Sequence, residues 1–314
     1  MNAGAIAFLE GILFVGENFG RGRVLVFDED GRGLHAGFEL GPGSAVSGLV
    51  ADSDRRLWIA DTASRHVRLW NVFGREDAGF VPQGGVLEAA AGGRTDGPVD
   101  VALAAGSTYT GVWALEGGLR RSAVGLYLPD GTRLEGLRSE GNPKQAFDHG
   151  TRLATAGELV AVLEHGRRQV QVFRGLEFHF AIPLMRAAGV SADRAVALAL
   201  LTDGSALVGL GPSEDAEVDP GAGVVERILW LEPSGHVRAE IANSASPQHP
   251  GGSTIDGLVD FALDPGSDPT AHSARDASQA ALYVLDRLGK RVQVFNLEGR
   301  AWGAFDTEEP FVVD

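Results

Sequence analysis

Leu57-Trp58-Ile59-Ala60-Asp61-Thr62-Ala63-Ser64-Arg65-His66-Val67-Arg68-Leu69-Trp70 is the stretch of this sequence that decides its fold. It holds a short apolar run that ends in an acidic residue, a polar turn, and a second run that ends in an aromatic residue, with Gly74 close behind. Such runs favour strands, and a polar connection of this length is typical of a turn between them. The stretch therefore predicts a β-hairpin.

The same unit occurs six times along the 314 residues. Residues 282–295 and 13–27 repeat it clearly, and three further copies are degenerate. The aromatic residues that end the second runs are Phe27, Trp70, Tyr127, Phe173, Trp230 and Phe295. One large aromatic side chain in each unit is what packing between neighbouring units demands, so we expect all six to be buried.

Further candidate strands flank each pair, such as residues 99–103 before the third pair and 176–182 after the fourth. Units of about four antiparallel strands, repeated every 43 to 65 residues as judged from the aromatics, are typical of a β-propeller. The sequence therefore predicts an all-β chain with one domain over residues 1–314, a six-bladed β-propeller of four-stranded antiparallel blades. The predicted blades span about 4–41, 45–85, 97–138, 145–184, 193–242 and 255–306. A β-sandwich or a double barrel is the structural alternative.

Bulk composition excludes several function classes. The net charge of −15 and the absence of any long run of Lys or Arg argue against nucleic acid and anionic membrane surfaces as partners. The chain has no cysteine, hence no disulfide and no thiolate site, and no stretch of 18 apolar residues that would insert into a membrane. The compartment stays open: the sequence as written fits the cytoplasm, and an exported protein whose signal peptide had been removed would look the same.

The repeat resembles that of the NHL family of β-propellers, in which an acidic residue, a polar turn, a basic residue and a Val-x-Val-Phe run follow one another. Residues 61–70, 286–295 and 17–27 carry this resemblance. It implies that the acidic and basic residues pair across the turn between the second and third strands of a blade. The residues at these paired positions are Asp61 and His66, Asp286 and Arg291, and Glu17 and Arg23. The sequence departs from the family pattern where His66 and Gln169 fill the basic position and Gly211 the acidic one, and the turns of those blades could close differently.

Carboxylates near the axis are the first candidates for chemistry. The phrase around Asp100 recurs around Asp260, in units that a six-fold ring places opposite each other, and we expect Asp148 to be their equivalent in the fourth unit. With Asn142 nearby, these side chains could hold a hard cation such as calcium, which takes oxygen ligands. This is loosely similar to the calcium-centred six-bladed lactonases and phosphotriesterases, although their Glu, Asn and Asp motifs are missing at matching positions. The alternative is that each aspartate only accepts hydrogen bonds from backbone amides.

Other catalytic chemistry finds less support. The eight histidines show no close-spaced pair, which argues against zinc sites like those of amidating lyases with NHL-like repeats. The Gly-x-Ser-x-Gly phrase of a serine nucleophile does not occur, and no glycine-rich phosphate loop precedes a helix. We therefore expect no catalytic residues and no cofactor other than calcium.

The leading functional prediction is a non-catalytic binding or scaffold propeller that presents a rim of loops to a protein partner, in the manner of a subunit of a larger assembly. Two insertions, at 211–220 and 264–280, are candidates for such contacts. The alternative is a calcium-dependent hydrolase or lyase with its site at the channel mouth, and a small-molecule or glycan sensor also remains open. The first unit holds four strands of its own between Ala5 and Leu40, so the usual exchange of a strand between the chain ends is not obvious. How the ring closes stays open, and the tail at 310–314 could seal the junction or pack elsewhere.

Overall fold

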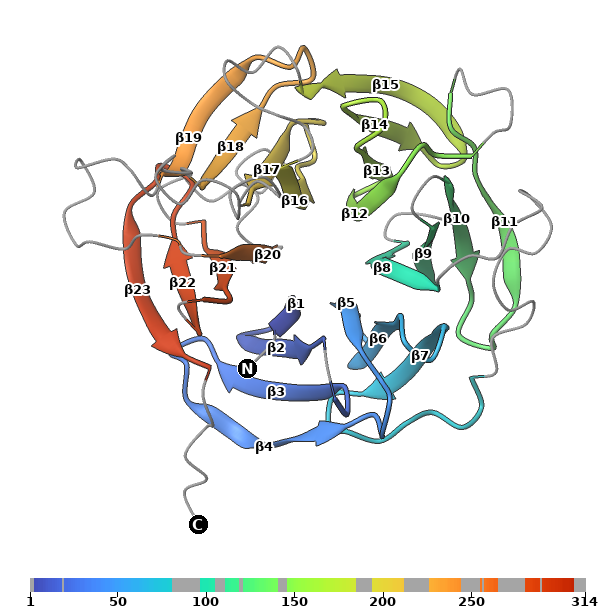
Figure 1. The fold of residues 1–314 in the computed structure, drawn as a ribbon, viewed down its shortest axis with the longest axis vertical. Coiled ribbons are helices and arrows are strands. Elements are labelled where there is room, and N and C mark those ends of the chain that lie inside the picture. The colour runs from blue at the N-terminus through green and yellow to red at the C-terminus, as the bar shows by residue number, and fades with distance from the viewer. Residues whose placement is uncertain are drawn as a thin grey trace, which may run out of the picture.

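The computed structural model shows six antiparallel sheets arranged in a ring around a central axis (Figure 1). It describes residues 3–18, 20–80, 97–104, 111–118, 121–140, 146–184, 194–211, 226–243, 255, 257–264, 280–288 and 290–307. Each sheet is one blade, and the first strand of each blade lies nearest the axis. The prediction of a six-bladed propeller with antiparallel, four-stranded blades is confirmed.

The strands follow one another outward from the axis in chain order. Blade one contains β1 (Ala3–Leu9), β2 (Ile12–Glu17), β3 (Arg23–Asp28) and β4 (Gly33–Glu39). Blade two contains β5 (Val46–Ala51), β6 (Arg56–Asp61) and β7 (His66–Asn71). Blade three contains β8 (Pro98–Leu103), β9 (Val112–Gly118), β10 (Arg121–Tyr127) and β11 (Arg133–Leu137). Blade four contains β12 (Gly150–Ala156), β13 (Leu159–Glu164), β14 (Gln169–Arg174) and β15 (Glu177–Pro183). Blade five contains β16 (Ala195–Leu200), β17 (Ala206–Leu210), β18 (Arg227–Leu231) and β19 (Val237–Asn243). Blade six contains β20 (Leu258–Leu263), β21 (Leu282–Asp286), β22 (Arg291–Phe295) and β23 (Ala301–Asp306).

Blade two differs from the others in its described part. Its three strands are followed by a turn, after which the chain returns along β7 through a bridge between Trp70 and Glu76. The backbone amide of Asp77 also donates to the carbonyl oxygen of Leu69. Residues 81–96, where the end of this predicted blade falls, lie outside the described residues.

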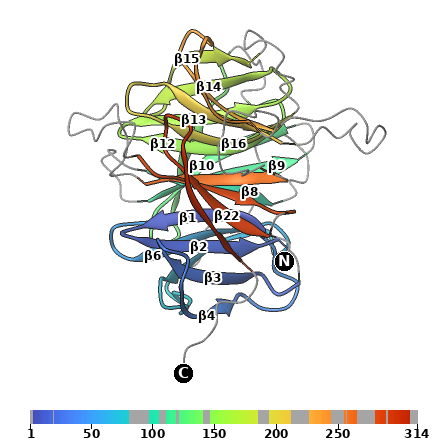
Figure 2. The ribbon, with the colours of Figure 1, turned by 90° about the vertical axis from the view of Figure 1, so that its left-hand side faces the viewer.

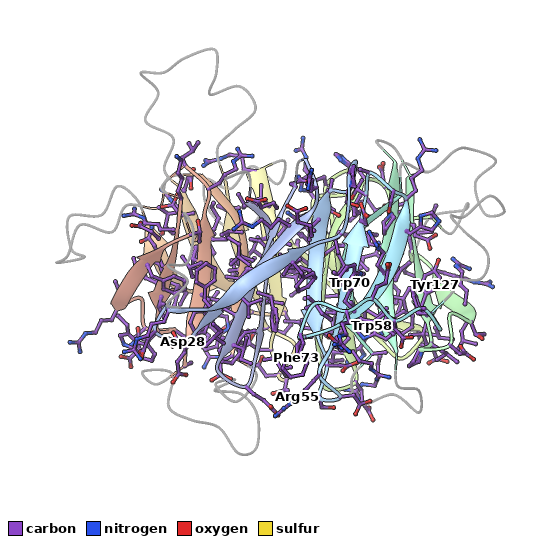
Figure 3. The ribbon with its side chains drawn as sticks, turned by 90° about the horizontal axis from the view of Figure 1, so that it is seen from below. Asp28, Arg55, Trp58, Trp70, Phe73 and Tyr127 are labelled. Atoms are coloured by element: carbon purple, nitrogen blue, oxygen red, sulfur yellow. The ribbon has the colours of Figure 1, made fainter. Side chains whose placement is uncertain are left out.

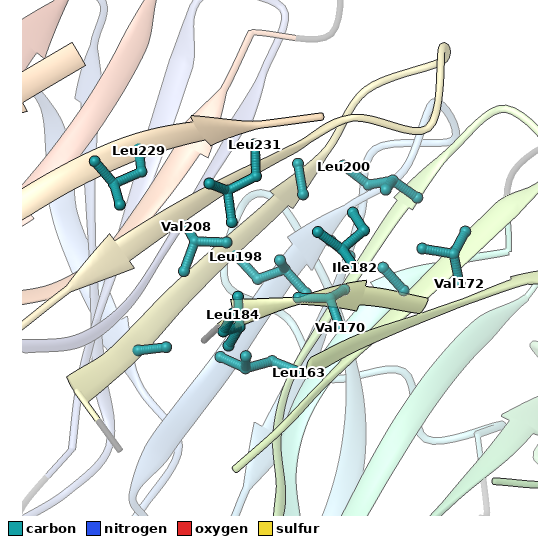
Figure 4. Close-up of a cluster of buried hydrophobic side chains, with 14 of the residues drawn as sticks. Leu163, Val170, Val172, Ile182, Leu184, Leu198, Leu200, Val208, Leu229 and Leu231 are labelled. Carbon is teal, nitrogen blue, oxygen red and sulfur yellow. The ribbon is translucent and has the colours of Figure 1, made fainter. Parts of the chain in front are cut away.

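Hydrophobic side chains between neighbouring blades form the core. The six predicted aromatics are all buried, with at most 7% of their surface exposed, which confirms that part of the sequence analysis. Figure 4 shows one such layer, in which Leu163 and Val172 of blade four face Val208 and Leu229 of blade five. Because both faces of most sheets are covered in this way, the middle strands are nearly continuous apolar runs.

Among the described residues the ring closes without strand exchange, a point that the sequence left open: β1 to β4 all belong to blade one, and β20 to β23 all belong to blade six. These two blades lie side by side (Figure 2). Phe8 stacks on Tyr283 with ring centroids 5.0 Å apart, and Phe27 packs against Phe305 at 5.6 Å. Side-chain packing therefore holds this junction together. The tail at 310–314 lies outside the described residues.

The two faces of the ring differ in their connections. One, which we call the turn face, carries the turns from first to second and from third to fourth strands; Asp28, Arg55 and Phe73 mark it in Figure 3. The other, the loop face, carries the connections from second to third strands and from each blade to the next. No helix in the described part of the chain is long and apolar enough to span a membrane.

Candidate functional site

Every first strand of a blade has an irregularity in its pairing at the same place. In each blade, the register between the first and second strands shifts by one residue. The first residue after this shift occupies an equivalent position around the axis in all six blades. These six positions, which we call the axial ring, are Ala5, Gly48, Asp100, Arg152, Ala197 and Asp260. Three of the six are charged, and they come from blades three, four and six.

The two aspartates of the axial ring connect neighbouring blades. Asp100 Oδ2 accepts a hydrogen bond of 2.7 Å from the backbone amide of Leu153 in blade four, and Oδ1 accepts one of 2.8 Å from Val101. Asp260 Oδ2 accepts the amide of Ile6 at 3.1 Å, across the junction between the last and first blades. The alternative weighed for these residues, bonding to backbone amides, is what the structure shows.

Arg152 is the member of the axial ring that the sequence analysis missed. Its Nη1 and Nη2 donate to the carbonyl oxygens of Thr151 and Val259, at 3.0 and 3.3 Å. Both acceptors precede ring residues in their strands, so the guanidinium is turned toward the loop face. Its Nε is buried and has no hydrogen-bond partner within the described ranges. Arg152 was missed because the phrase shared by units three and six has no copy in blade four.

Asp100, which is buried, and Asp260, which is half-buried, are harder to ionise than carboxyl groups in water. Burial raises the pKa of Asp100 to about 7; the charge of Arg152 opposes this and the charge of Asp260 adds to it. Burial likewise raises the pKa of Asp260 to about 6, again opposed by Arg152. When both aspartates are ionised, the axial ring carries two negative charges and the single positive charge of Arg152, so its net charge is negative.

A cavity of about 320 Å³ extends from these aspartates toward the turn face. Its walls come from the ends of all six first strands and are mostly aliphatic. Its polar side chains are Asp100, Asp260, Thr155 and Thr202. An apolar hollow with a few converging polar groups is the usual form of a small-molecule site.

The proposed calcium ligands are not brought together. Asp100 and Asp260 lie at the axial ring, but Asp148 is exposed at the loop face, where its carboxyl group lies against Gly166. The equivalent of Asp100 in blade four is Arg152, so the assignment of Asp148 to that role was wrong. Asn142 lies outside the described residues. Among the described residues, no three His, Asp or Glu side chains gather closely enough to hold a metal ion.

The predicted turn pairs meet with different outcomes. Arg291 Nε lies 3.1 Å from Asp286 Oδ2, as expected. Asp61 pairs instead with Arg68, at 3.4 Å, and His66 is exposed. His66 stands directly opposite Asp61 in the strand register, whereas the longer arginine reaches it from a diagonal position.

The first blade lacks this kind of turn pair. The described part of the chain shows no ion pair between Glu17 and Arg23, both of which are half-buried. Blade five departs in another way, as the Gly211 position suggested: Glu226, before β18, accepts the amides of Gly257 and Leu258 in the next blade.

Buried carboxylates also fix connections of the loop face. Glu164 accepts the backbone amide of Asp148 and the side-chain amide of Gln171, at 2.6 and 2.7 Å. Asp61 accepts the amides of Ala45 and Ser64. Burial alone would raise the pKa of Asp61, but these hydrogen bonds outweigh it and hold the pKa below its usual value. Connections that enter the first strands are thereby held in place.

Most of the large exposed hydrophobic side chains among the described residues lie toward the turn face, spread over five blades. Phe73, Leu176 and Trp302 are 71%, 49% and 48% exposed, and each lies in or just after the turn that follows a third strand. Leu34, Phe178 and Val237 lie at the starts of outer strands. On the loop face, Leu288 is the one exposed residue of this kind among those described. Within the described ranges, the turn face therefore carries more exposed large hydrophobic side chains than the loop face.

Comparison with known proteins identifies the fold. No family model and no curated protein matches the sequence. Among solved structures, a streptogramin B lyase is 12% identical over 98% of this chain and 84% of its own, with a TM-score of 0.55. A gluconolactonase from Xanthomonas campestris is 14% identical over 91% and 83%, with a TM-score of 0.55. A chain of a nidogen–laminin complex is 12% identical over 94% of both chains, with a TM-score of 0.58. Likeness at this identity establishes the propeller fold.

Proposed function

We propose that this propeller is a non-catalytic binding module that docks a protein partner on its turn face. The observation that carries the proposal is the distribution of exposed large hydrophobic side chains among the described residues, six of which lie toward that face, against Leu288 on the other. Contiguous apolar patches mark interaction surfaces, and aromatic residues are enriched at such interfaces. A resemblance of the repeat to the NHL type agrees with a binding role.

The sequence analysis left open which rim of loops meets the partner. Of its two candidate insertions, the one at 211–220 lies between β17 and β18 and the one at 264–280 between β20 and β21; apart from Gly211, Asp264 and Ala280, their residues lie outside those described. Carboxylates outnumber guanidinium groups in the described turns of the turn face, including Glu29, Asp30 and Glu158. We therefore expect the partner to bring apolar and basic side chains to this surface.

The described contacts do not favour catalysis. Thr151 Oγ1 lies 3.3 Å from His165 Nε2, a spacing that suggests an activated hydroxyl. The same nitrogen is 2.6 Å from the carbonyl oxygen of Ala195, which can only accept a hydrogen bond. Nε2 therefore carries its proton toward Ala195 and cannot take one from Thr151. The solved relatives include both enzymes and a chain of a protein complex, so the fold does not choose between the two functions.

Paired surface substitutions test the proposal. The double variant Phe73→Ser, Trp302→Ser removes two exposed anchors without touching the core, and Leu288→Ser is the matched control on the loop face. We expect the double variant to lose binding to a partner isolated with the wild-type protein, by about tenfold or more in Kd, and Leu288→Ser to keep it. Equal binding by all three proteins, or loss only in Leu288→Ser, would contradict a partner on the turn face.

A further inference from the structure

The shape of the axial cavity follows from one strand position. Two residues beyond each member of the axial ring, five of the six first strands carry alanine and the sixth carries valine. These residues are Ala7, Val50, Ala102, Ala154, Ala199 and Ala262, and all of them line the cavity. Their small side chains leave an aliphatic hollow next to Asp100 and Asp260, on the side of the turn face.

The two carboxyl groups at its inner end keep free acceptor positions. Each oxygen of Asp100 receives one backbone amide, and a carboxylate oxygen has room for a second donor. In the described part of the protein, neither Asp100 nor Asp260 has a Lys, Arg or His nitrogen within ion-pair distance. Arg152 influences both through its charge, but its hydrogen bonds go to Thr151 and Val259 on the side away from the cavity.

We propose that the axial cavity binds a small organic ammonium compound, with its cationic end at Asp100 and Asp260 and its apolar body against the ring of alanines. The ammonium group donates hydrogen bonds to carboxylate oxygens that face the cavity. The apolar body replaces water along walls that offer Thr155 and Thr202 as their remaining polar side chains. The site takes the ligand from the turn face, into which the cavity extends.

Charge decides the ligand class. The axial ring carries two carboxyl groups and one guanidinium, so a carboxylate or phosphate ligand would be repelled. A neutral alcohol could donate one hydrogen bond but would leave the buried carboxylates without a countercharge. An ammonium group supplies that charge where burial makes ionisation of Asp100 and Asp260 costly, and a charge-assisted bond in such a place is stronger than a neutral one.

Isothermal titration calorimetry with two probes of the same body tests the charge requirement. We would titrate 2-phenylethylamine and 2-phenylethanol into the full chain at about pH 8, above the pKa of Asp100, where both carboxyl groups are ionised. The expected result is that the amine binds about tenfold or more tightly than the alcohol. Equal affinity for both probes, or no measurable binding of the amine, would overturn the proposal.

Three variants locate the bound amine. Asp260→Asn removes one carboxylate charge from the site, and Ala199→Leu fills the cavity while leaving both carboxylates intact. Glu158→Gln is the matched control, since it removes one negative charge from an exposed turn beside the cavity. We expect each of the first two variants to weaken amine binding about tenfold or more, and Glu158→Gln to leave it unchanged.

Equal amine affinity in wild type and Ala199→Leu would place the amine elsewhere and overturn the proposal. If Asp260→Asn fails to fold, as judged by its thermal transition, Ala199→Leu decides alone. The result is independent of partner docking, because the partner test depends on Phe73 and Trp302, neither of which lines the cavity.

Discussion

The side chain of Asp100 both connects two blades by a hydrogen bond and interacts with the other charged groups of the axial ring. It accepts the amide of Leu153 in the next blade, and its carboxyl group lies close enough to Asp260 and Arg152 for their charges to change its pKa. The sequence analysis identified both aspartates from their repeated phrase but assigned Asp148 to the fourth blade. Arg152 could not be found in the same way, because the shared feature is a backbone irregularity and the residues at that position range from glycine and alanine to aspartate and arginine.

The raised pKa of Asp100 predicts a pH-dependent stability. Its pKa is about 7 in the folded protein against an ordinary value of 3.8, so the folded state binds more protons than the unfolded chain between these pH values. The free energy of unfolding contributed by this group therefore falls as pH rises from about 4 to about 7 and is level above that range. Asp100→Asn lacks this dependence.

Urea unfolding of both proteins measures the effect. The stability of wild type relative to Asp100→Asn should fall by about 2 to 4 kcal/mol between about pH 4 and pH 8. Comparing the two proteins at each pH cancels the titrating groups that do not interact with Asp100, whereas Asp260, whose charge raises the pKa of Asp100, contributes to the difference. A difference that stays constant, or grows with pH, would show that Asp100 ionises at least as readily in the fold as in water.

At the scale of elements, the distance between neighbouring first strands depends on the size of the side chains at the positions of the axial ring. Gly48 does not have a positive φ, so its backbone conformation does not require glycine. Its place is set by the neighbour: an added Cβ would lie 2.5 Å from Asp100 Oδ1 and 2.8 Å from Asp100 Cα. β5 and β8 can therefore approach this closely only because a glycine faces an aspartate.

Gly48→Ala is predicted to destabilise the protein by about 1 to 3 kcal/mol, because β5 and β8 must move apart. Gly303→Ala is a matched control: Gly303 is also in a strand without a positive φ, and an added Cβ there would meet nothing within 4 Å. The control should be neutral or slightly stabilising. Thermal or urea unfolding of both variants checks the prediction, which fails if the two glycines behave alike.

Elements also show where sequence reading was sufficient. The strand pairs, their aromatic ends and the pair between Asp286 and Arg291 follow from local pattern, because neighbouring strands here are neighbours in sequence. The contact between Asp61 and Arg68 does not follow from local pattern. Strand alternation places both His66, directly opposite, and Arg68, diagonally opposite, on the same face as Asp61, and it does not decide between them. Which of two donors reaches a buried carboxylate depends on side-chain length and on the blade that covers it.

At the scale of the whole molecule, neither ring closure nor the distribution of exposed groups could be predicted from the sequence. Four strands in the first unit made strand exchange not obvious but left the junction undecided, and the packing of Phe8 on Tyr283 now supplies the contact. Residues such as Phe73 and Trp302 are far apart in sequence, and the repeat pattern alone does not say which aromatics are left uncovered. That both lie toward the turn face follows from the arrangement of the blades in the closed ring.

Hydroxyl-radical footprinting of the protein alone and in complex with an isolated partner tests the central claim most directly. Phe73, Leu176 and Trp302 on the turn face and Leu288 on the loop face are all exposed, so all four should be modified in the free protein. A docking module that uses the turn face predicts strong protection of Phe73, Leu176 and Trp302 in the complex, with Leu288 unchanged. Protection of Leu288 while the other three stay reactive would contradict it.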